Sequence, residues 1–134
     1  MKRKRVVILA IVLAVLVAVA LGLRGFLTNI ESNLAKLTDM VPAQIDLNAL
    51  EDGVYSGSYS VFPVSAKVSV TVKDHRIAAI ELIEHKNGQG SSAEVIPGKV
   101  LKAQSLQVDS VSGATYSSKV ILKAIENALL GSRP

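Results

Sequence analysis

The first hydrophobic feature of the chain is an unbroken apolar run. Residues 6–23 are apolar apart from one glycine, and the four cations of residues 2–5 precede them. A helix of these 18 residues is about 27 Å long, close to the thickness of a bilayer's hydrocarbon core. Cations on the short side of such a helix favour a cytoplasmic N-terminus. Residues 1–24 are therefore predicted to be a basic tail and a transmembrane anchor. A cleaved signal peptide is the alternative, because residues 18–20 offer a small-residue cleavage site.

Beyond the apolar run the pattern becomes amphipathic. Apolar side chains recur at three- and four-residue spacing, with polar residues between them, at Leu27, Ile30, Leu34 and Leu37. This spacing predicts a helix that continues the anchor as a stalk or lies over the folded domain, and Pro42 ends it. Residues 25–50 are therefore predicted to be a stalk helix and linker. Packing of the apolar stripe on the chain's own domain is preferred over a role in binding a partner helix.

Strand patterns come first in the rest of the chain, residues 51–134, and helical patterns follow. Alternation of apolar and polar residues predicts strands over residues 54–61, 66–73 and 76–84. Asp74 and His75 lie where the tight turn of a hairpin belongs. Apolar spacing then predicts helical segments within residues 92–105, a short strand at 106–108 and a helix whose stripe covers 120–129. This order indicates an α+β fold, an antiparallel sheet with flanking helices, preceded by one N-terminal transmembrane helix.

The charge distribution excludes one class of partner. The formal net charge is +4, but residues 1–24 alone carry +5 and residues 51–134 are nearly neutral. A nucleic-acid-binding domain needs its basic surface on the folded part, so the charge argues against nucleic acid as a partner. The absence of cysteine excludes disulfides, thiolate metal sites and cysteine nucleophiles. The two histidines, His75 and His85, are too few for a multi-histidine metal site.

The candidate chemistry lies directly before the C-terminal helix. Residues 109–118 read Asp-Ser-Val-Ser-Gly-Ala-Thr-Tyr-Ser-Ser. Small residues allow the backbone to approach a ligand closely, and a helix N-terminus favours an anion such as phosphate. Thr115 adds a hydroxyl at the same place, which suits a phosphoester that is either bound or covalently attached. The alternative is structural, because Ser, Thr and Asp before a helix are commonly N-caps.

The spacing Asp109-x-x-Ser112-Gly113-Ala114-Thr115 resembles the flavinylation motif of the FMN-binding domain family. That family includes the covalent-flavin subunits of sodium-pumping NADH:quinone reductases and of Rnf electron-transport complexes, together with small membrane-anchored or secreted relatives. Residues 52–57 are also similar to the family's domain opening. We therefore interpret residues 51–134 as a flavin-carrying domain of this kind.

The resemblance implies a cofactor and a modifying enzyme. In this family a flavin transferase, assisted by magnesium, uses FAD to attach FMN through a phosphoester bond to the threonine of the motif. Carried over to this chain, Thr115 is the FMN acceptor, and Ser112, Gly113 and Ala114 form the tight backbone around the phosphate. Asp109 occupies the motif's acidic position, where it helps the transferase to recognise the site or binds the transferase's metal. No resident metal is expected.

Two further residues are weaker candidates for flavin contacts. His85 ends a strand beside a glycine-rich loop, and Tyr55 lies on one face of the first strand. The alternatives are a surface or capping histidine and a core aromatic residue. The loop itself, residues 87–90, departs from the sequence that often follows His-Lys in the family. Lys119 and Lys123 are predicted to form the solvated face of the last helix.

Together these inferences predict an extracytoplasmic, membrane-tethered flavoprotein that carries electrons on FMN attached to Thr115. A membrane-associated electron donor is its expected partner. No Ser/His/Asp set or carboxylate pair has a spacing that argues for hydrolysis, so an electron-transfer protein is expected rather than a stand-alone catalyst. Two other classes stay open, namely a module that binds FMN or another small ligand without a covalent bond, and a structural or interaction domain without cofactor.

Overall fold

The long N-terminal helix spans the boundary between two compact units of the chain. The computed structural model describes residues 1–86, 88 and 90–131, and the units are Met1–Ser32 and Asn33–Pro134. Helix α1, Lys2–Thr38, begins in the first unit and ends in the second, so the apolar run and the amphipathic stretch form one helix. It is long and apolar enough to cross a membrane. A signal sequence near the N-terminus can have the same length and composition.

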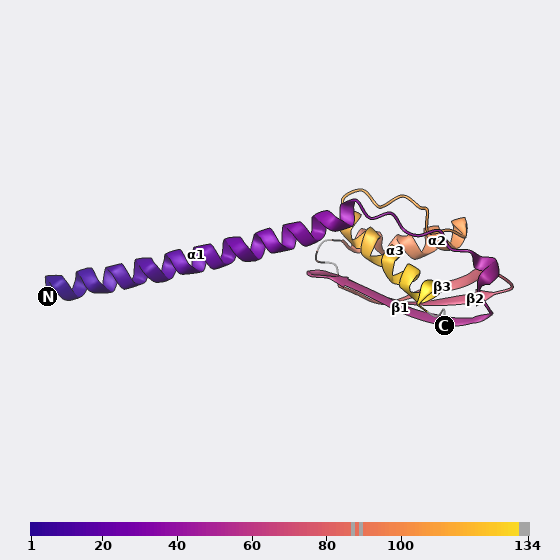
Figure 1. The fold of residues 1–134 in the computed structure, drawn as a ribbon, viewed down its shortest axis with the longest axis horizontal. Coiled ribbons are helices and arrows are strands. Elements are labelled where there is room, and N and C mark those ends of the chain that lie inside the picture. The colour runs from indigo at the N-terminus through magenta and orange to yellow at the C-terminus, as the bar shows by residue number, and fades with distance from the viewer. Residues whose placement is uncertain (87, 89, 132–134) are drawn as a thin grey trace. The chain divides into compact units, whose positions relative to one another are not determined.

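The second unit is built on a three-stranded antiparallel sheet in the order β1-β2-β3 (Figure 1). The strands are β1 Gly53–Val61, β2 Val64–Lys73 and β3 Arg76–Lys86. Asp74 and His75 join β2 to β3 with φ values of 51° and 57°, the positive values that a two-residue hairpin turn requires. The predicted α+β fold with its antiparallel sheet is confirmed, and each strand extends one or two residues beyond its predicted range.

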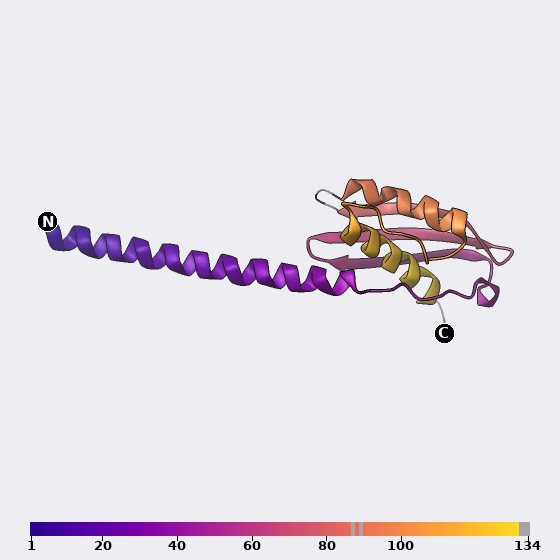
Figure 2. The ribbon, with the colours of Figure 1, turned by 90° about the horizontal axis from the view of Figure 1, so that it is seen from above.

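Helices α2 and α3 cover one face of this sheet (Figure 1). The short 3-10 helix η2, Ser91–Val95, leads into α2, Ile96–Ala103, and α3 spans Thr115–Leu130. α3 lies over β1 and β2, whereas α2 lies on the side of β3 (Figure 2). Another 3-10 helix, η1 Leu47–Ala49, precedes the sheet. Alternate residues of β2 point into the core, as a period of two requires, and the buried ones are Val64, Ala66, Val68, Val70 and Val72.

The connection between α2 and α3 is irregular. Residues 104–114, all of them described, contain no strand, so the predicted short strand at residues 106–108 is wrong. Leu106 is nevertheless buried, and the Val108 N–H donates to the Leu106 carbonyl at 2.9 Å. The apolar residues of this connection therefore contribute to the core through side-chain packing and local hydrogen bonding rather than through strand pairing.

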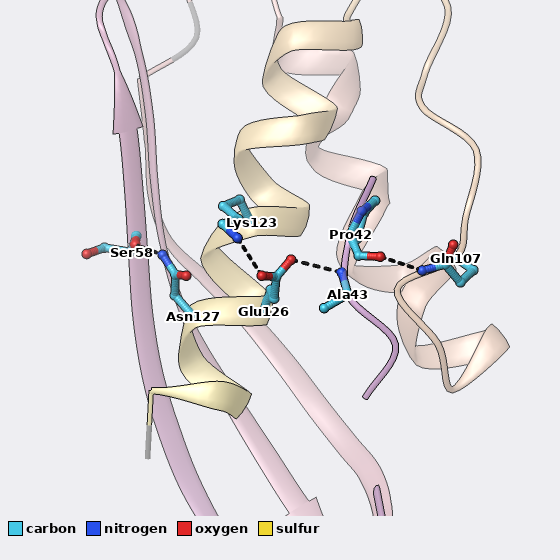
Figure 3. Close-up of polar contacts among 7 residues, drawn as sticks. All are labelled: Pro42, Ala43, Ser58, Gln107, Lys123, Glu126 and Asn127. Carbon is cyan, nitrogen blue, oxygen red and sulfur yellow. Dashed lines mark hydrogen bonds and ion pairs between the residues drawn. The ribbon is translucent and has the colours of Figure 1, made fainter. Parts of the chain in front are cut away.

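Helix α3 approaches the backbone of β1 closely at Gly57. A Cβ atom on Gly57 would lie 2.3 Å from both the Ala124 carbonyl oxygen and the Ala128 amide nitrogen, far inside van der Waals contact. Beside this contact, Asn127 Nδ2 donates to the Ser58 carbonyl at 2.9 Å (Figure 3). The two contacts fix α3 on the sheet and so fix the position of the helix N-terminus.

The end of α1 and the segment that follows it pack on the second unit. Leu37, near the end of α1, is buried with 2% of its surface exposed, and Leu34 and Met40 pack partly buried against the core. For Leu34 and Leu37 the preferred prediction, packing of the apolar stripe on the chain's own domain, is confirmed.

The solvated face predicted for the last helix is wrong. Lys119 Nζ donates to the Met40 carbonyl at 2.5 Å, and Lys123 Nζ forms an ion pair with Glu126 Oε1 at 2.5 Å. Glu126 is buried, with 6% of its surface exposed. Both lysines are therefore part-buried, and their ammonium groups have protein partners at the contact between α3 and the linker.

Candidate functional site

The motif residues before α3 form a tight turn. The Ala114 N–H donates to the Val111 carbonyl at 3.0 Å, and Gly113 between them has φ +79°. A positive φ at the third residue of a turn is a conformation that glycine adopts without strain. Ser112 and Gly113 are exposed and Ala114 is buried, so the turn is fixed at one end and presents its tip to the surface.

A buried hydroxyl holds this turn against the helix. Ser118 Oγ accepts a hydrogen bond from the Val111 N–H at 2.9 Å and donates one to the Ala114 carbonyl at 2.8 Å. Its side chain is fully buried. Sequence reasoning gave Ser118 no role of its own, because a serine in the first turn of a helix is usually read as a capping or solvent-facing residue. Its place is the one sequence signal, within one turn of Thr115 and at helical spacing before Ile121 and Ile125 of the apolar stripe.

The N-terminus of α3 lacks the side-chain cap that the structural alternative requires. Thr115 is the first helical residue, Ala114 is the N-cap, and the cap makes no side-chain hydrogen bond. Ser112 and Asp109 therefore do not cap α3. The first amides of a helix carry partial positive charge and no intrahelical partners. At this helix end no side chain among the described residues caps them, which suits an anion.

Two hollows meet at the start of α3. One, of about 330 Å³, is lined by Thr38, Gly113, Thr115 and Tyr116. The other, of about 150 Å³, is also lined by Gly113, Thr115 and Tyr116. Its remaining lining residues are Val64, Gly90, Ala114 and Ser117. Sites for small molecules and cofactors commonly measure about 300–1,000 Å³, so the first hollow has the size of such a site. Thr115, which is half-buried, lies on the border of both.

Asp109 lies apart from this cluster in the structure. It borders a third hollow together with Lys99 and Lys102, and its carbonyl oxygen lies 3.4 Å from Lys99 Nζ. The structure thus brings Gly113, Ala114 and Thr115 together around the two hollows, while Asp109 belongs to the preceding connection. Among the described residues, no three His, Asp or Glu side chains gather as a metal site.

The weaker candidates also lie elsewhere. His85 has a buried side chain, and its Nδ1 lies 3.1 Å from Glu94 Oε1. Tyr55 donates its hydroxyl proton to the Glu51 carbonyl at 2.7 Å and packs partly buried against the core. Neither is among the described residues that line the two hollows at Thr115. The loop beyond His85 includes residues 87 and 89, which lie outside the described residues.

Comparison with known proteins assigns this domain to a family. A model of the FMN-binding domain matches residues 64–130, half of the chain, and this range includes the turn, Thr115 and the whole of α3. The chain belongs to the FMN-binding domain family. FMN is the cofactor of this domain, and the resemblance in the motif is thereby confirmed at the level of the family.

Two curated relatives match part of the chain. An uncharacterized protein of Treponema pallidum (strain Nichols) is 31% identical over 88 residues, which are 63% of this chain and 24% of that protein. The NADH:acrylate oxidoreductase of Vibrio harveyi is 35% identical over 65 residues, 46% of this chain and 6% of that protein. The chain thus spans a quarter or less of the length of these relatives. No solved structure matches the chain significantly.

The residues at the start of α3 fit FMN. Its phosphate needs hydrogen-bond donors and positive potential, which the uncapped helix N-terminus provides. Its ring system needs a hollow with an aromatic or apolar wall, and the larger hollow has Tyr116 among its lining residues. Thr115 lines that hollow and is the first residue of the helix. The site for the phosphate and the site for the ring therefore meet at this residue.

Proposed function

We propose that this FMN-binding domain is an extracytoplasmic, membrane-tethered flavoprotein whose FMN is joined by a phosphoester bond to Thr115. The observation that carries the proposal is the position of Thr115. It is the first residue of a helix without a side-chain cap, and it borders both hollows. A hydroxyl in this position can bear a phosphate while the helix amides stabilise the phosphate's charge.

The attachment step balances with FAD as the donor. Thr115 Oγ1 forms a bond to the phosphorus atom of the FMN half, the anhydride bond to the AMP half breaks, AMP leaves, and the hydroxyl proton is released. A flavin transferase with bound magnesium supplies this reaction in the proposal. Thr115 is half-buried and the nearby residues Ser112 and Gly113 are exposed, so the hydroxyl lies directly after a turn that an enzyme can reach.

The chain's own contribution is retention and orientation. FMN supplies the redox chemistry when bound. Gly113 leaves space beside the phosphate, because no atom lies within 4 Å of where its Cβ would be, and Ser118 fixes the turn. A covalent bond keeps the site loaded outside the cytoplasm, where free flavin is scarce and reversible occupancy would depend on its concentration.

The anchor supports the rest of the proposal. Residues 6–23 form part of a helix that is apolar enough to span a bilayer, and the cations of residues 2–5 favour the cytoplasmic side for the N-terminus. We therefore place the domain outside the membrane, where it takes electrons from a membrane-associated donor.

Production of the full chain with and without a flavin transferase tests the attachment. With the transferase, the intact mass is expected to increase by one FMN less one water, and the band is expected to fluoresce after denaturing electrophoresis. Thr115→Ala abolishes both signals, whereas Thr115→Ser, which keeps a hydroxyl, retains part of them.

The same experiment separates the other classes of function. Flavin that co-purifies but is lost on denaturation would indicate a reversible FMN module and contradict the covalent bond. If the chain with Thr115 kept its unmodified mass and bound no flavin, whether or not the transferase was present, the proposal as a whole would be contradicted.

A further inference from the structure

One wall of the larger hollow comes from a part of the chain outside the family match. Thr38 is the last residue of α1, and it lines this hollow with Gly113, Thr115 and Tyr116. The match to the FMN-binding domain begins only at residue 64. The sequence predicted a stalk and linker in this region, not a part of the flavin site.

The segment that carries Thr38 is anchored by apolar packing on the domain. Leu37, its neighbour, is buried with 2% of its surface exposed, and Leu34 and Met40 pack against the same core. Full burial of a leucine side chain stabilises a structure by about 1.5–3 kcal/mol relative to leaving it in water. This packing holds Thr38 at the hollow even though its own side chain is exposed.

Domain side chains bind the backbone of the residues that follow. Lys119 Nζ donates to the Met40 carbonyl at 2.5 Å. Gln107 Nε2 donates to the Pro42 carbonyl at 2.7 Å, and the Ala43 N–H donates to Glu126 Oε2 at 3.1 Å (Figure 3). These contacts satisfy backbone groups that have left the helix and belong to no strand.

Charge reinforces one of these contacts. The buried carboxylate of Glu126 receives the Ala43 N–H on one oxygen and the Lys123 ammonium group on the other (Figure 3). A buried carboxylate needs such partners to offset its lost hydration. Separation of the linker from α3 would remove one of them, so the segment is held by groups that are costly to expose.

We propose that residues 33–43 form a latched wall of the flavin site, in which Thr38 contacts the FMN that Thr115 holds. This inference rests on the proposed function, because it requires flavin at Thr115. Residues 33–43 are then part of the flavin site rather than a free linker between the anchor and the domain. Their last helical turn covers one side of the cofactor, and contacts from Gln107, Lys119 and Glu126 keep it there.

The chain has no cysteine, so an introduced thiol reports on the wall directly. The test measures the maleimide reaction rate of Thr38→Cys in the full chain, with and without attached FMN as counted by intact mass. Attachment is expected to slow the reaction by about tenfold or more, because a covered group reacts only when its cover moves away. Val41→Cys is the matched control. Val41 is 75% exposed and lies in the same segment, and its rate is expected not to change.

The latch is tested in the chain without flavin. Lys119→Met removes the donor to Met40 but keeps the aliphatic stem, and hydrogen exchange over residues 39–46 is expected to become faster, while Lys119→Arg restores protection. Gln107→Met provides a second, surface-exposed variant in case Lys119→Met does not fold. Lys73→Met, on an exposed position of β2, is expected to exchange as the unmodified chain does.

The outcomes separate this inference from the proposed function. FMN found on Thr115 together with an unchanged Thr38→Cys rate would overturn the wall and leave the proposed function intact. Unchanged exchange in both Lys119→Met and Gln107→Met would overturn the latch. Absence of FMN from Thr115 would overturn the proposed function, and the wall with it.

Discussion

The side chain of Ser118 connects the turn before α3 to the helix itself. Its hydroxyl bonds both the Val111 N–H and the Ala114 carbonyl, so the geometry around Thr115 depends on a buried residue one helical turn further on. The family resemblance singled out Gly113 and Thr115, and the positive φ of Gly113 is a local property that suits glycine. The role of Ser118 depends on how the turn folds back, which local spacing does not encode.

Ser118→Ala tests this dependence. The substitution leaves the part-buried Val111 N–H without its acceptor, which costs about 1–3 kcal/mol of the free energy of unfolding. It is also expected to lower the fraction of chain that carries FMN, because the turn loosens beside the acceptor. Urea unfolding of the full chain in detergent, followed by circular dichroism, measures the stability, and intact mass measures the attachment.

Ser112→Ala is the matched control for this experiment. Ser112 lies in the same turn but is exposed, so its removal is expected to change the stability by less than about 0.5 kcal/mol. Equal stabilities for Ser118→Ala and Ser112→Ala would show that the buried hydroxyl does not hold the turn.

At the scale of the elements, the position of the site is set by the packing of α3 on β1. The patterns of period two and 3.6 predicted the strands and this helix, because each pattern records which side of an element is buried. They did not predict the partner of Lys119, since Met40 lies 79 positions away in the sequence. They also misassigned residues 106–108, where apolar side chains pack without a strand partner.

Gly57→Ala tests the contact between α3 and β1. The added Cβ would lie 2.3 Å from backbone atoms of Ala124 and Ala128, which cannot rotate away, so the helix must shift. Overpacking of this kind costs about 1–3 kcal/mol, measured by the same urea unfolding. Gly53→Ala in the same strand is the control, because nothing lies within 4 Å of where its Cβ would be, and it is expected to unfold as the unmodified chain does. A Gly57→Ala chain as stable as Gly53→Ala would contradict the close packing of α3.

At the scale of the whole molecule, the excess positive charge of the chain indicates the membrane orientation of its N-terminus rather than a surface that binds a partner. The excess of +5 in residues 1–24 against the near-neutral residues 51–134 predicted an anchor, and α1 has the length and composition of one. The apolar stripe also favoured packing of the end of α1 on the domain, but it did not predict that Thr38 lines the hollow beside Thr115. An amphipathic stripe shows that a helix has an apolar face but not which surface covers it.

Single-cysteine variants test the proposed topology in intact cells. A membrane-impermeant maleimide is expected to label Ser56→Cys, an exposed position of β1, without lysis. Lys2→Cys is expected to react only after lysis, and on a chain of full mass, because its segment stays in the cytoplasm and is not cleaved. Ser56→Cys that reacts only after lysis would contradict an extracytoplasmic domain, and loss of residue 2 from the mature chain would identify the apolar run as a cleaved signal.

The bond between FMN and Thr115 is the central claim, and peptide sequencing by mass spectrometry tests it most directly. Trypsin releases residues 103–119 of the flavin-loaded chain as one peptide, since cleavage follows Lys102 and Lys119. Electron-transfer fragmentation is expected to place the added FMN mass on Thr115 alone. An FMN mass on any of the peptide's other hydroxyl residues, or an unmodified peptide from a chain produced with the transferase, would contradict the claim.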